Sequence, residues 1–363
     1  MSIIEMGLDT FGDITVDANG RPQPAARVLR DVVAEAELAD RLGIDSIGLG
    51  EHHRPDFAIS APEVVLAAIA ARTTRIRLGT AVTVLSTDDP VRVYERFATL
   101  DALSNGRAEV VLGRGSFTES FPLFGYSLDD YEALFEEKLA LFAAVRDADQ
   151  AGKPVRWQGT VRPPLDVATV TPRVERPPLS TWVGVGGSPE SVVRAARYGF
   201  PLTLAIIGGD PRRFAPYVEL YHQALAQLGR PTLPVGVHSP GHVAESDARA
   251  SDELWPHYQV MRNRIGAERG WGPTSRAEFE REIAAGSLYV GSPETVAGKI
   301  ASTVRALGAA RFDLKYSAGT LPHETMLRSI ELYGREVMPR ARELLAGEPS
   351  VPGERGITVS GES

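Results

Sequence analysis

The chain has 363 residues, of which 43% are hydrophobic and 24% are charged, values that are ordinary for a soluble globular protein. Its 39 basic and 47 acidic residues give a net charge of -8, which argues against nucleic acid or a membrane as a partner. The sequence has no cysteine, which excludes disulfides, thiolate catalysis and cysteine-ligated metal centres. Any redox chemistry must therefore come from a cofactor. Because the first ten residues lack a basic leader, we expect a cytoplasmic enzyme.

Short apolar runs alternate with longer segments of helical periodicity, which is the pattern of a parallel sheet with crossover helices. Eight strands favour a closed barrel over an open sheet, so we predict a TIM (β/α)8 barrel that occupies one domain, residues 1–346. The predicted strands are residues 6–11, 46–51, 76–84, 108–113, 181–186, 202–207, 234–237 and 312–315.

Two connections are much longer than is usual between the elements of such a fold. Residues 150–180 are rich in Pro and Arg, and residues 245–287 contain Trp255 and Trp271. We expect both to be insertions at the C-terminal face of the barrel, either as lids or as structural buttresses. The final stretch, residues 347–363, is rich in Gly, Ser and Pro without apolar periodicity and is predicted to be a disordered tail.

The tripeptide Glu51-His52-His53 closes the apolar run 44–49 and precedes a loop, residues 54–56, that cannot continue a strand. Ionisable groups at the end of a buried strand are costly to desolvate, so a chain that keeps three of them there is expected to use them. A satisfied core histidine is the weaker alternative. Alternation along a strand places Glu51 and His53 on one side and His52 on the other, which leaves open which histidine is catalytic.

A glycine-rich turn connects the strand at 181–186 to the next helix. Gly186 and Gly187 allow a ligand to approach the backbone, Ser188 suits the helix N-cap, and Pro189 suits the first helical position. The free N–H groups of the helix start predict a phosphate site there, with Ser191 in its first turn. A near repeat at residues 291–295 is interpreted as helix capping alone, because one glycine and no clear strand precede it.

Arg114 lies between two glycines at the end of the strand at 108–113, so its guanidinium is aimed at the mouth of the barrel. Its expected partner is an anion, either a cofactor phosphate or Glu51, with a structural salt bridge inside the barrel as the alternative. Four phenylalanines are candidates for an apolar substrate wall, although they are equally compatible with the core: Phe11, Phe117, Phe121 and Phe124.

Several of these segments, taken in order, resemble the bacterial-luciferase-like family of flavin-dependent oxidoreductases and monooxygenases. Each motif is weak by itself, but the ordered set is specific and extends from residue 4 to about residue 340. The matching segments are residues 48–53, 78–85, 90–92, 103–107, 113–115 and 186–191, and the run at 113–126 is similar to uncharacterised monooxygenase-like members.

The resemblance implies a barrel that binds reduced FMN, or in some branches the deazaflavin F420, at the C-terminal ends of its strands. His52 matches the histidine required for the oxygen chemistry, Glu51 lies beside the flavin, and His53 is the second choice. Ala81 and Val82 match a pair that is joined by a cis peptide bond under the flavin ring. The phosphate ligands implied by the family are Arg114, Ser188 and Ser191, with Gly186 and Gly187 in the same turn.

Two positions depart from the luciferase pattern. Glu132 stands where luciferase has a second phosphate-binding arginine, and Gly187 stands where luciferase has a glutamate. The charge of the phosphate must therefore be balanced differently, and close functional identity with luciferase is not expected. Residues 129–132 are interpreted as a solvated helix start whose carboxylates suit the helix dipole.

The leading hypothesis is a two-component monooxygenase that receives FMNH2 from a separate flavin reductase, forms a flavin hydroperoxide with O2 and oxygenates a small organic substrate. The alternatives are F420-dependent hydride transfer on the same barrel and a non-catalytic flavin-binding subunit. A metal-dependent hydrolase is disfavoured because His238 and His242 are separated by Ser239-Pro240-Gly241, so no metal site is predicted. Family members commonly dimerise, so a homodimer is expected.

Overall fold

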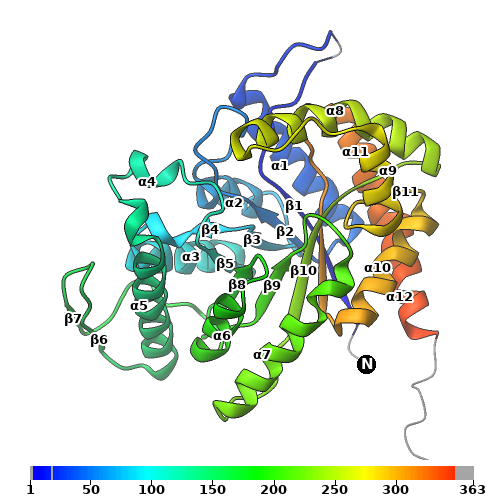
Figure 1. Ribbon diagram of the computed structural model, residues 1–363. Helices are drawn as coiled ribbons and strands as arrows, with labels where there is room; N and C mark the ends of the chain where they lie inside the picture. Colours follow the sequence, from blue (N-terminus) through cyan, green and yellow to red (C-terminus); the bar gives the residue numbers. More distant parts are fainter. Residues whose placement is uncertain (1–2, 18, 348–363) are drawn as a thin grey trace, which may run out of the picture.

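The computed structural model describes residues 3–17 and 19–347 and shows a barrel of parallel strands surrounded by helices (Figure 1). The strands follow the order β3-β2-β1-β12-β10-β9-β8-β5-β4, and a bridge between Leu78 and Ala108 joins β3 to β5 and closes the ring. The predicted TIM barrel is confirmed. Its strands are β1 Glu5–Thr10, β2 Ser46–Leu49, β3 Arg77–Thr80, β4 Thr83–Val84, β5 Glu109–Gly113, β8 Ser180–Val185, β9 Leu202–Ala205, β10 Val235–Val243 and β12 Arg311–Lys315.

The helices lie outside the ring and carry their apolar faces inward. In α1, Val28, Val32, Ala36 and Ala39 are buried at the spacing of one helical face, and the helix ends at Gly43 in the left-handed conformation. The other helices are α2 Pro62–Ala70, α3 Pro90–Ser104, α4 Ser120–Leu123, α5 Tyr131–Ala151, α6 Pro189–Tyr198, α7 Ala215–Gln227, α8 Asp247–Arg269, α9 Arg276–Ala285, α10 Pro293–Leu307, α11 His323–Leu332 and α12 Met338–Ala346, and α1 spans Ala25–Leu42.

The seventh strand is longer than predicted, and this corrects the interpretation of its histidines. We expected residues 234–237, but β10 continues through Pro240 to Val243, so His238 and His242 lie on one strand. Pro240 is tolerated because β10 changes neighbours there, from β9 at residues 235–238 to β11, Tyr289–Gly291, at residues 241–243. The short strand β11 was also missed, so a strand does precede the second Gly-Ser-Pro-Glu turn.

The amino-terminal end of the barrel is filled by an ion-pair cluster. Arg311 Nη1 lies 2.6 Å from Glu109 Oε1, and Arg311 Nε lies 2.7 Å from Asp313 Oδ2. Asp313 also accepts a hydrogen bond of 3.3 Å from Ser46 Oγ. A Cβ at Gly7 would fall 2.1 Å from Asp313 Oδ1, so this close packing requires glycine. The floor of the barrel is thus closed by protein side chains.

The insertion at residues 150–180 does not lie where we expected it. It connects the C-terminal end of α5 to β8, and such a connection begins at the amino-terminal ends of the strands. Its hairpin, β6 Val155–Trp157 and β7 Leu165–Val167, turns back along α5, where Glu137 accepts a hydrogen bond of 2.8 Å from Val161 N. The segment therefore covers the outside of α5, and its expected position over the mouth was wrong.

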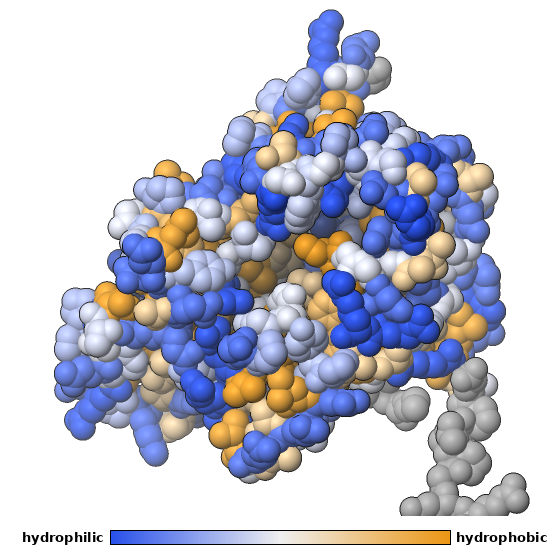
Figure 2. Space-filling model, viewed as in Figure 1, coloured by the Kyte–Doolittle hydropathy of each residue, from blue (hydrophilic) through white to orange (hydrophobic). Residues whose placement is uncertain are grey.

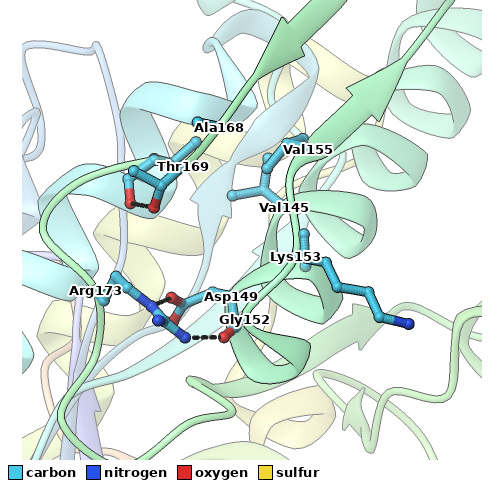
Figure 3. Close-up of a pocket in the computed structure, with 10 residues that line it drawn as sticks. Val145, Asp149, Gly152, Lys153, Val155, Ala168, Thr169 and Arg173 are labelled. Atoms are coloured by element: carbon cyan, nitrogen blue, oxygen red, sulfur yellow. Dashed lines mark hydrogen bonds and ion pairs between the residues drawn. The ribbon is translucent and has the colours of Figure 1, made fainter.

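A cavity of about 70 Å³ lies between α5 and this insertion, on the outer wall of the barrel (Figure 3). The side chains of Asp149 and Arg173 lie beside it, with 2.5 Å between Arg173 Nε and Asp149 Oδ1. Tyr94 donates a hydrogen bond of 2.6 Å to the same carboxylate. This small cavity belongs to the packing of the insertion against α5 and lies away from the carboxyl ends of the strands.

The insertion at residues 245–287 lies on the mouth side of the barrel, as expected, because it follows the carboxyl end of β10. It forms α8 and α9, and α8 is tied to the loop that follows β2. Arg54 Nη2 lies 2.5 Å from Glu268 Oε1, and Asp56 Oδ2 lies 3.6 Å from Arg264 Nη1. Whether the segment moves as a lid stays a prediction. The tail expected at 347–363 lies outside the described residues, apart from Gly347.

Within residues 3–17 and 19–347, no helix combines the length and the apolar character needed to cross a membrane. The surface is mixed in polarity and is hollowed near the centre of the view in Figure 2, where apolar residues are visible. The sequence-expected functional residues after β2, β5 and β8 all follow strands of the barrel at the same end.

Candidate active site

Glu51 and His53 lie on the same side of the segment after β2, as strand alternation predicted. Glu51 Oε1 lies 2.9 Å from His53 Nε2, and Glu51 Oε2 accepts a hydrogen bond of 2.8 Å from Val84 N. The hydrogen bond to Glu51 raises the pKa of His53 above its ordinary value despite partial burial. Glu51 therefore holds the His53 imidazole toward its protonated form and also anchors the backbone that follows β3.

His52 points to the other side, into a group of aromatic rings. Its ring centroid lies 4.4 Å from Phe57, 4.8 Å from Phe11 and 5.1 Å from Phe117. Its Nδ1 lies 3.6 Å from Glu119 Oε1. Burial alone would raise the pKa of Glu119, but the interaction with His52 and backbone hydrogen bonds lower it below its usual value. His52 is therefore a largely enclosed imidazole, with 11% of its side chain exposed and a carboxylate facing its Nδ1.

The four candidate phenylalanines lie in different surroundings. Phe11 and Phe117 pack against His52, and Phe124, which is 49% exposed, lies 5.0 Å from the ring of His53. Phe121 is fully buried and stacks on Tyr131 at 5.4 Å, so it belongs to the core. Sequence analysis missed Phe57 and Glu119. Glu119 carried a signal, since it lies within the run at 113–126 that resembles monooxygenase-like proteins, whereas nothing in the sequence marked Phe57.

The peptide bond between Ala81 and Val82 is cis, and it interrupts the predicted third strand between β3 and β4. Glycines surround this pair: a Cβ at Gly113 would lie 2.3 Å from Val82 Cγ2, and one at Gly184 would lie 2.8 Å from Val82 Cγ1. Only glycine permits Val82 to lie this close to β5 and β8. The cis bond agrees with the family pattern, and the cofactor contact of Ala81 and Val82 stays a prediction.

The turn at 186–191 has the predicted local structure. Ser188 is the N-cap of α6, its Oγ accepts a hydrogen bond of 3.3 Å from Ser191 N, and Pro189 is the first helical residue. Gly187 has φ +99°, a conformation that favours glycine, and a Cβ at Gly186 would meet nothing within 4 Å. The start of α6 therefore presents an open, donor-rich surface.

Arg114 pairs with neither Glu51 nor a barrel-core carboxylate, so both protein partners considered for it were wrong. It forms an ion pair with Glu132, whose other oxygen, Oε2, lies 2.9 Å from Arg194 Nη2. Glu132 is 58% exposed and lies in the first turn of α5, as expected, but it bridges two arginines instead of being only solvated. Glu132 stands where luciferase has an arginine, and its negative charge is thus balanced by Arg114 and Arg194 of the same chain.

Sequence analysis missed Arg194, which lies on α6 three residues after Ser191. Arg194 Nε lies 2.6 Å from Glu136 Oε2, and its Nη1 is buried without a hydrogen-bond partner among the described residues. The three-residue spacing places Ser191 and Arg194 on one face of the helix, which could have indicated that Arg194 lies near the predicted phosphate site. The ion pair of Arg194 with Glu132 could not be predicted, because Glu132 is distant in the sequence.

Other imidazoles at the barrel also pair with carboxylates. His238 Nδ1 lies 2.7 Å from Asp9 Oδ2, and His242 Nε2 lies 2.9 Å from Glu253 Oε2. In the described part of the chain, no group of three or more His, Cys, Asp or Glu side chains is arranged to hold a metal ion.

A closed parallel barrel with imidazoles, arginines and an open helix start at the carboxyl ends of its strands defines a (β/α)8-barrel enzyme. Residues 10–311 match the family described as luciferase-like monooxygenase, and the chain belongs to this family. It is 30% identical to 4-hydroxyprotoasukamycin monooxygenase of Streptomyces nodosus subsp. asukaensis over 341 residues, which cover 89% of this chain and 90% of that protein.

Solved structures agree with the family assignment. Monooxygenase RslO1 from Streptomyces bottropensis superposes with a TM-score of 0.80 at 26% identity, covering 93% of this chain and 99% of that one. The oxygenating constituent of 3,6-diketocamphane monooxygenase from Pseudomonas putida, solved with FMN, has a TM-score of 0.74 at 19% identity, covering 93% and 98%. The F420-dependent tetrahydromethanopterin reductase of Methanopyrus kandleri has a TM-score of 0.69 at 18% identity, covering 93% and 99%, and shares the fold.

Proposed function

We propose that the protein is an FMNH2-dependent, two-component monooxygenase that acts on a small organic substrate. The observation that carries the proposal is the arrangement of His52. Its ring lies among Phe11, Phe57 and Phe117, and its Nδ1 faces Glu119. An imidazole in an apolar pocket at the mouth of a luciferase-like barrel suits proton handling from which bulk water is excluded.

The residues present fit the phosphate of FMN. The N-terminus of α6 offers backbone N–H groups and the Ser188 and Ser191 hydroxyls, and the space in front of Gly186 is open. The buried, unpartnered Nη1 of Arg194 and the Arg114 guanidinium supply positive charge nearby. When bound, reduced FMN would supply the two electrons with which O2 delivers one oxygen atom to the substrate and one to water.

The chain's own residues would then orient groups, exclude water and handle protons. No described residue hydrogen-bonds to His52 Nε2, so this nitrogen remains available to give or take a proton while Nδ1 faces Glu119. Glu51 holds the His53 ring and the Val84 amide in place. The glycine-lined space around Ala81 and Val82 is proposed to accept the flat cofactor ring.

The competing functions are F420-dependent hydride transfer and a non-catalytic flavin-binding subunit, and cofactor titration distinguishes them. We expect tight binding of reduced FMN under anaerobic conditions and a rapid absorbance change on exposure to air. A stable complex with reduced F420, together with no oxygen reaction of the FMNH2 complex, would contradict the proposal. A separate flavin reductase, a homodimeric assembly and a cytoplasmic location are further parts of the proposal.

The variant His52→Ala sharpens this experiment. We expect it to retain FMN binding, because the phosphate would be held at α6, but to lose about 100-fold or more of the oxygenation rate, a typical contribution of general acid–base catalysis. The matched control is His323→Ala, which removes a carboxylate-paired imidazole on α11. Equal turnover of His52→Ala and the wild-type protein would show that His52 is not the proton-handling group.

A further inference from the structure

Three histidines outside the cluster after β2 pair with carboxylates, and they differ in the state of the second ring nitrogen. His323 meets carboxylates with both nitrogens, Nδ1 at 2.7 Å from Glu35 Oε1 and Nε2 at 3.8 Å from Asp31 Oδ1. His242 is bound through Nε2 to Glu253, its side chain is 0% exposed, and its Nδ1 is buried. The ring of His242 is thus closed off from a ligand, and both nitrogens of His323 already face carboxylates of the protein.

His238 is different. Its Nδ1 lies 2.7 Å from Asp9 Oδ2, but no described residue hydrogen-bonds to its Nε2, and that nitrogen is not among the buried unpartnered atoms. Its side chain is 11% exposed, the same fraction as that of His52. Because the contact with Asp9 on β1 crosses the inside of the ring, the exposed part of His238 faces the interior of the barrel.

This imidazole lies near His52, with the ring of Phe11 between them. The His238 ring is stacked on Phe11 with an interplanar angle of 12° and a centroid distance of 6.2 Å, and Phe11 lies 4.8 Å from the His52 ring. The two histidines therefore flank one aromatic side chain. Each turns Nδ1 toward a carboxylate and leaves Nε2 free.

The surroundings of His238 favour its protonated form. Burial lowers the pKa of His238, but the carboxylates of Asp9 and Asp313 outweigh burial and the opposing charge of Lys315, so that its pKa is raised. The only hydrogen bond of the Asp9 carboxylate among the described residues is the one to His238, since Asp9 Oδ1 is buried without a partner. A protonated imidazole is a strong hydrogen-bond donor.

We propose that His238 is a substrate-binding residue whose Nε2–H donates a hydrogen bond to the carbonyl oxygen of an otherwise apolar substrate, and that Asp9 is its positioning residue. The apolar body would pack on Phe11, Phe57 and Phe117. This inference deepens the proposed function and rests on it, since it assigns a substrate class to the same pocket.

The test uses two probes of similar size, acetophenone and ethylbenzene, in which a carbonyl group of the first replaces a methylene group of the second. Binding is measured by calorimetry, and the infrared carbonyl stretch of bound acetophenone reports the hydrogen bond. We expect the wild-type protein to prefer acetophenone by about tenfold or more, as for a hydrogen bond to a charged donor, with a lowered carbonyl frequency. Absence of a preference in the wild-type protein would overturn the proposal.

His238→Leu should lose both the preference and the frequency shift, while ethylbenzene affinity changes less than about threefold. The matched control His323→Leu also removes an imidazole from a buried carboxylate, Glu35, and should retain the preference. Retention of the preference in His238→Leu, or its loss in both variants, would overturn the proposal.

Asp9→Asn keeps the histidine and tests Asp9 separately. The preference should disappear as pH rises through the pKa of His238, and in Asp9→Asn this loss should occur at lower pH because the raising charge is gone. If the pH at which half of the preference is lost were the same in Asp9→Asn and in the wild-type protein, Asp9 would not be the positioning residue. Neither measurement uses flavin or O2. If the probes show no carbonyl preference but the FMNH2 complex still reacts with O2, only the role of His238 is contradicted. If the carbonyl preference is found but the FMNH2 complex does not react with O2, the proposed monooxygenase function is contradicted.

Discussion

The starts of α6 and α10 carry almost the same sequence but opposite electrostatic environments. Both have a glycine with positive φ, a serine N-cap and a proline at the first helical position. At α10, Asp247 Oδ1 accepts a hydrogen bond of 2.7 Å from Ser292 N, and Oδ2 accepts one of 3.0 Å from Thr295 Oγ1. The protein's own carboxylate thus occupies the anion position of this helix.

At α6 the same position is free of protein carboxylates. In the described part of the chain, no acidic group accepts a hydrogen bond from Ser188 N or from Ser191 Oγ, and the space in front of Gly186 is open. The local motif therefore determines only that a helix begins there. Whether its N-terminal donors bind a carboxylate of the protein or remain available to a ligand depends on a residue that is distant in the sequence.

Filling the open turn should have the largest effect. Gly186→Val adds a side chain where a Cβ meets no protein atom, so the fold should tolerate it. The new side chain would occupy the space proposed for the phosphate, and we expect the affinity for FMN to fall on the order of 100-fold. Fluorescence titration of FMN, with the melting temperature as a control for folding, measures this. Unchanged FMN affinity would mean that the two helix starts do not differ in function.

Removing the internal anion at α10 should act on stability. Asp247→Ala should lower the free energy of unfolding by about 1–2 kcal/mol, because two donors lose their acceptor. The hydrogen bond from Ser292 lowers the pKa of Asp247, so its contribution is present above the unfolded pKa, near 4, and is lost as pH falls through the folded pKa. Denaturant unfolding at pH 7 and at pH 3 should show this difference shrinking.

The control is Asp252→Ala, which removes an exposed carboxylate of the same helix that lies 3.0 Å from Arg276. We expect a loss below about 0.5 kcal/mol for such an exposed ion pair. Equal losses for the two aspartates would show that Asp247 is an ordinary surface charge.

Neutralising Glu132 should give the smallest effect. Glu132→Gln weakens the hold on Arg114 and Arg194 and removes a negative charge beside the proposed phosphate site. We therefore expect FMN to bind roughly threefold to tenfold more tightly at low salt, with the gain reduced at high ionic strength. Weaker binding would indicate that Glu132 holds the arginines in the position that the phosphate needs.

Much of the fold could be predicted from the sequence, because each barrel strand is a short apolar run between amphipathic helices. This alternation can be recognised along the chain without knowledge of tertiary contacts. The end of β10 could not, because Pro240 normally interrupts a strand and is tolerated here only where the neighbouring strand changes. The position of residues 150–180 does not follow from their length, because a segment that follows a helix begins at the amino-terminal ends of the strands, and one that follows a strand begins at the carboxyl ends.

The candidate site shows a similar division. The opposite orientations of His52 and of the pair Glu51 and His53 follow from strand alternation, and the structure confirms them. The partners of Arg114 and Asp247 are not their neighbours in the sequence, so no local pattern could identify them. The ion pair of Arg114 with Glu132 and the hydrogen bonds that Asp247 accepts from Ser292 and Thr295 depend on how α5, α8 and α10 pack.

The two insertions are attached to different parts of the barrel. The hairpin at 150–180 rests on the outside of α5, and its tip reaches the start of α3, where Arg162 Nε lies 2.7 Å from Asp89 Oδ2. Helix α8 is tied through Glu268 and Arg264 to the loop directly after His53. Changes within residues 245–287 would therefore alter what the mouth of the barrel admits, while the ion-pair cluster at its opposite end is not contacted by α8 in the described part of the chain.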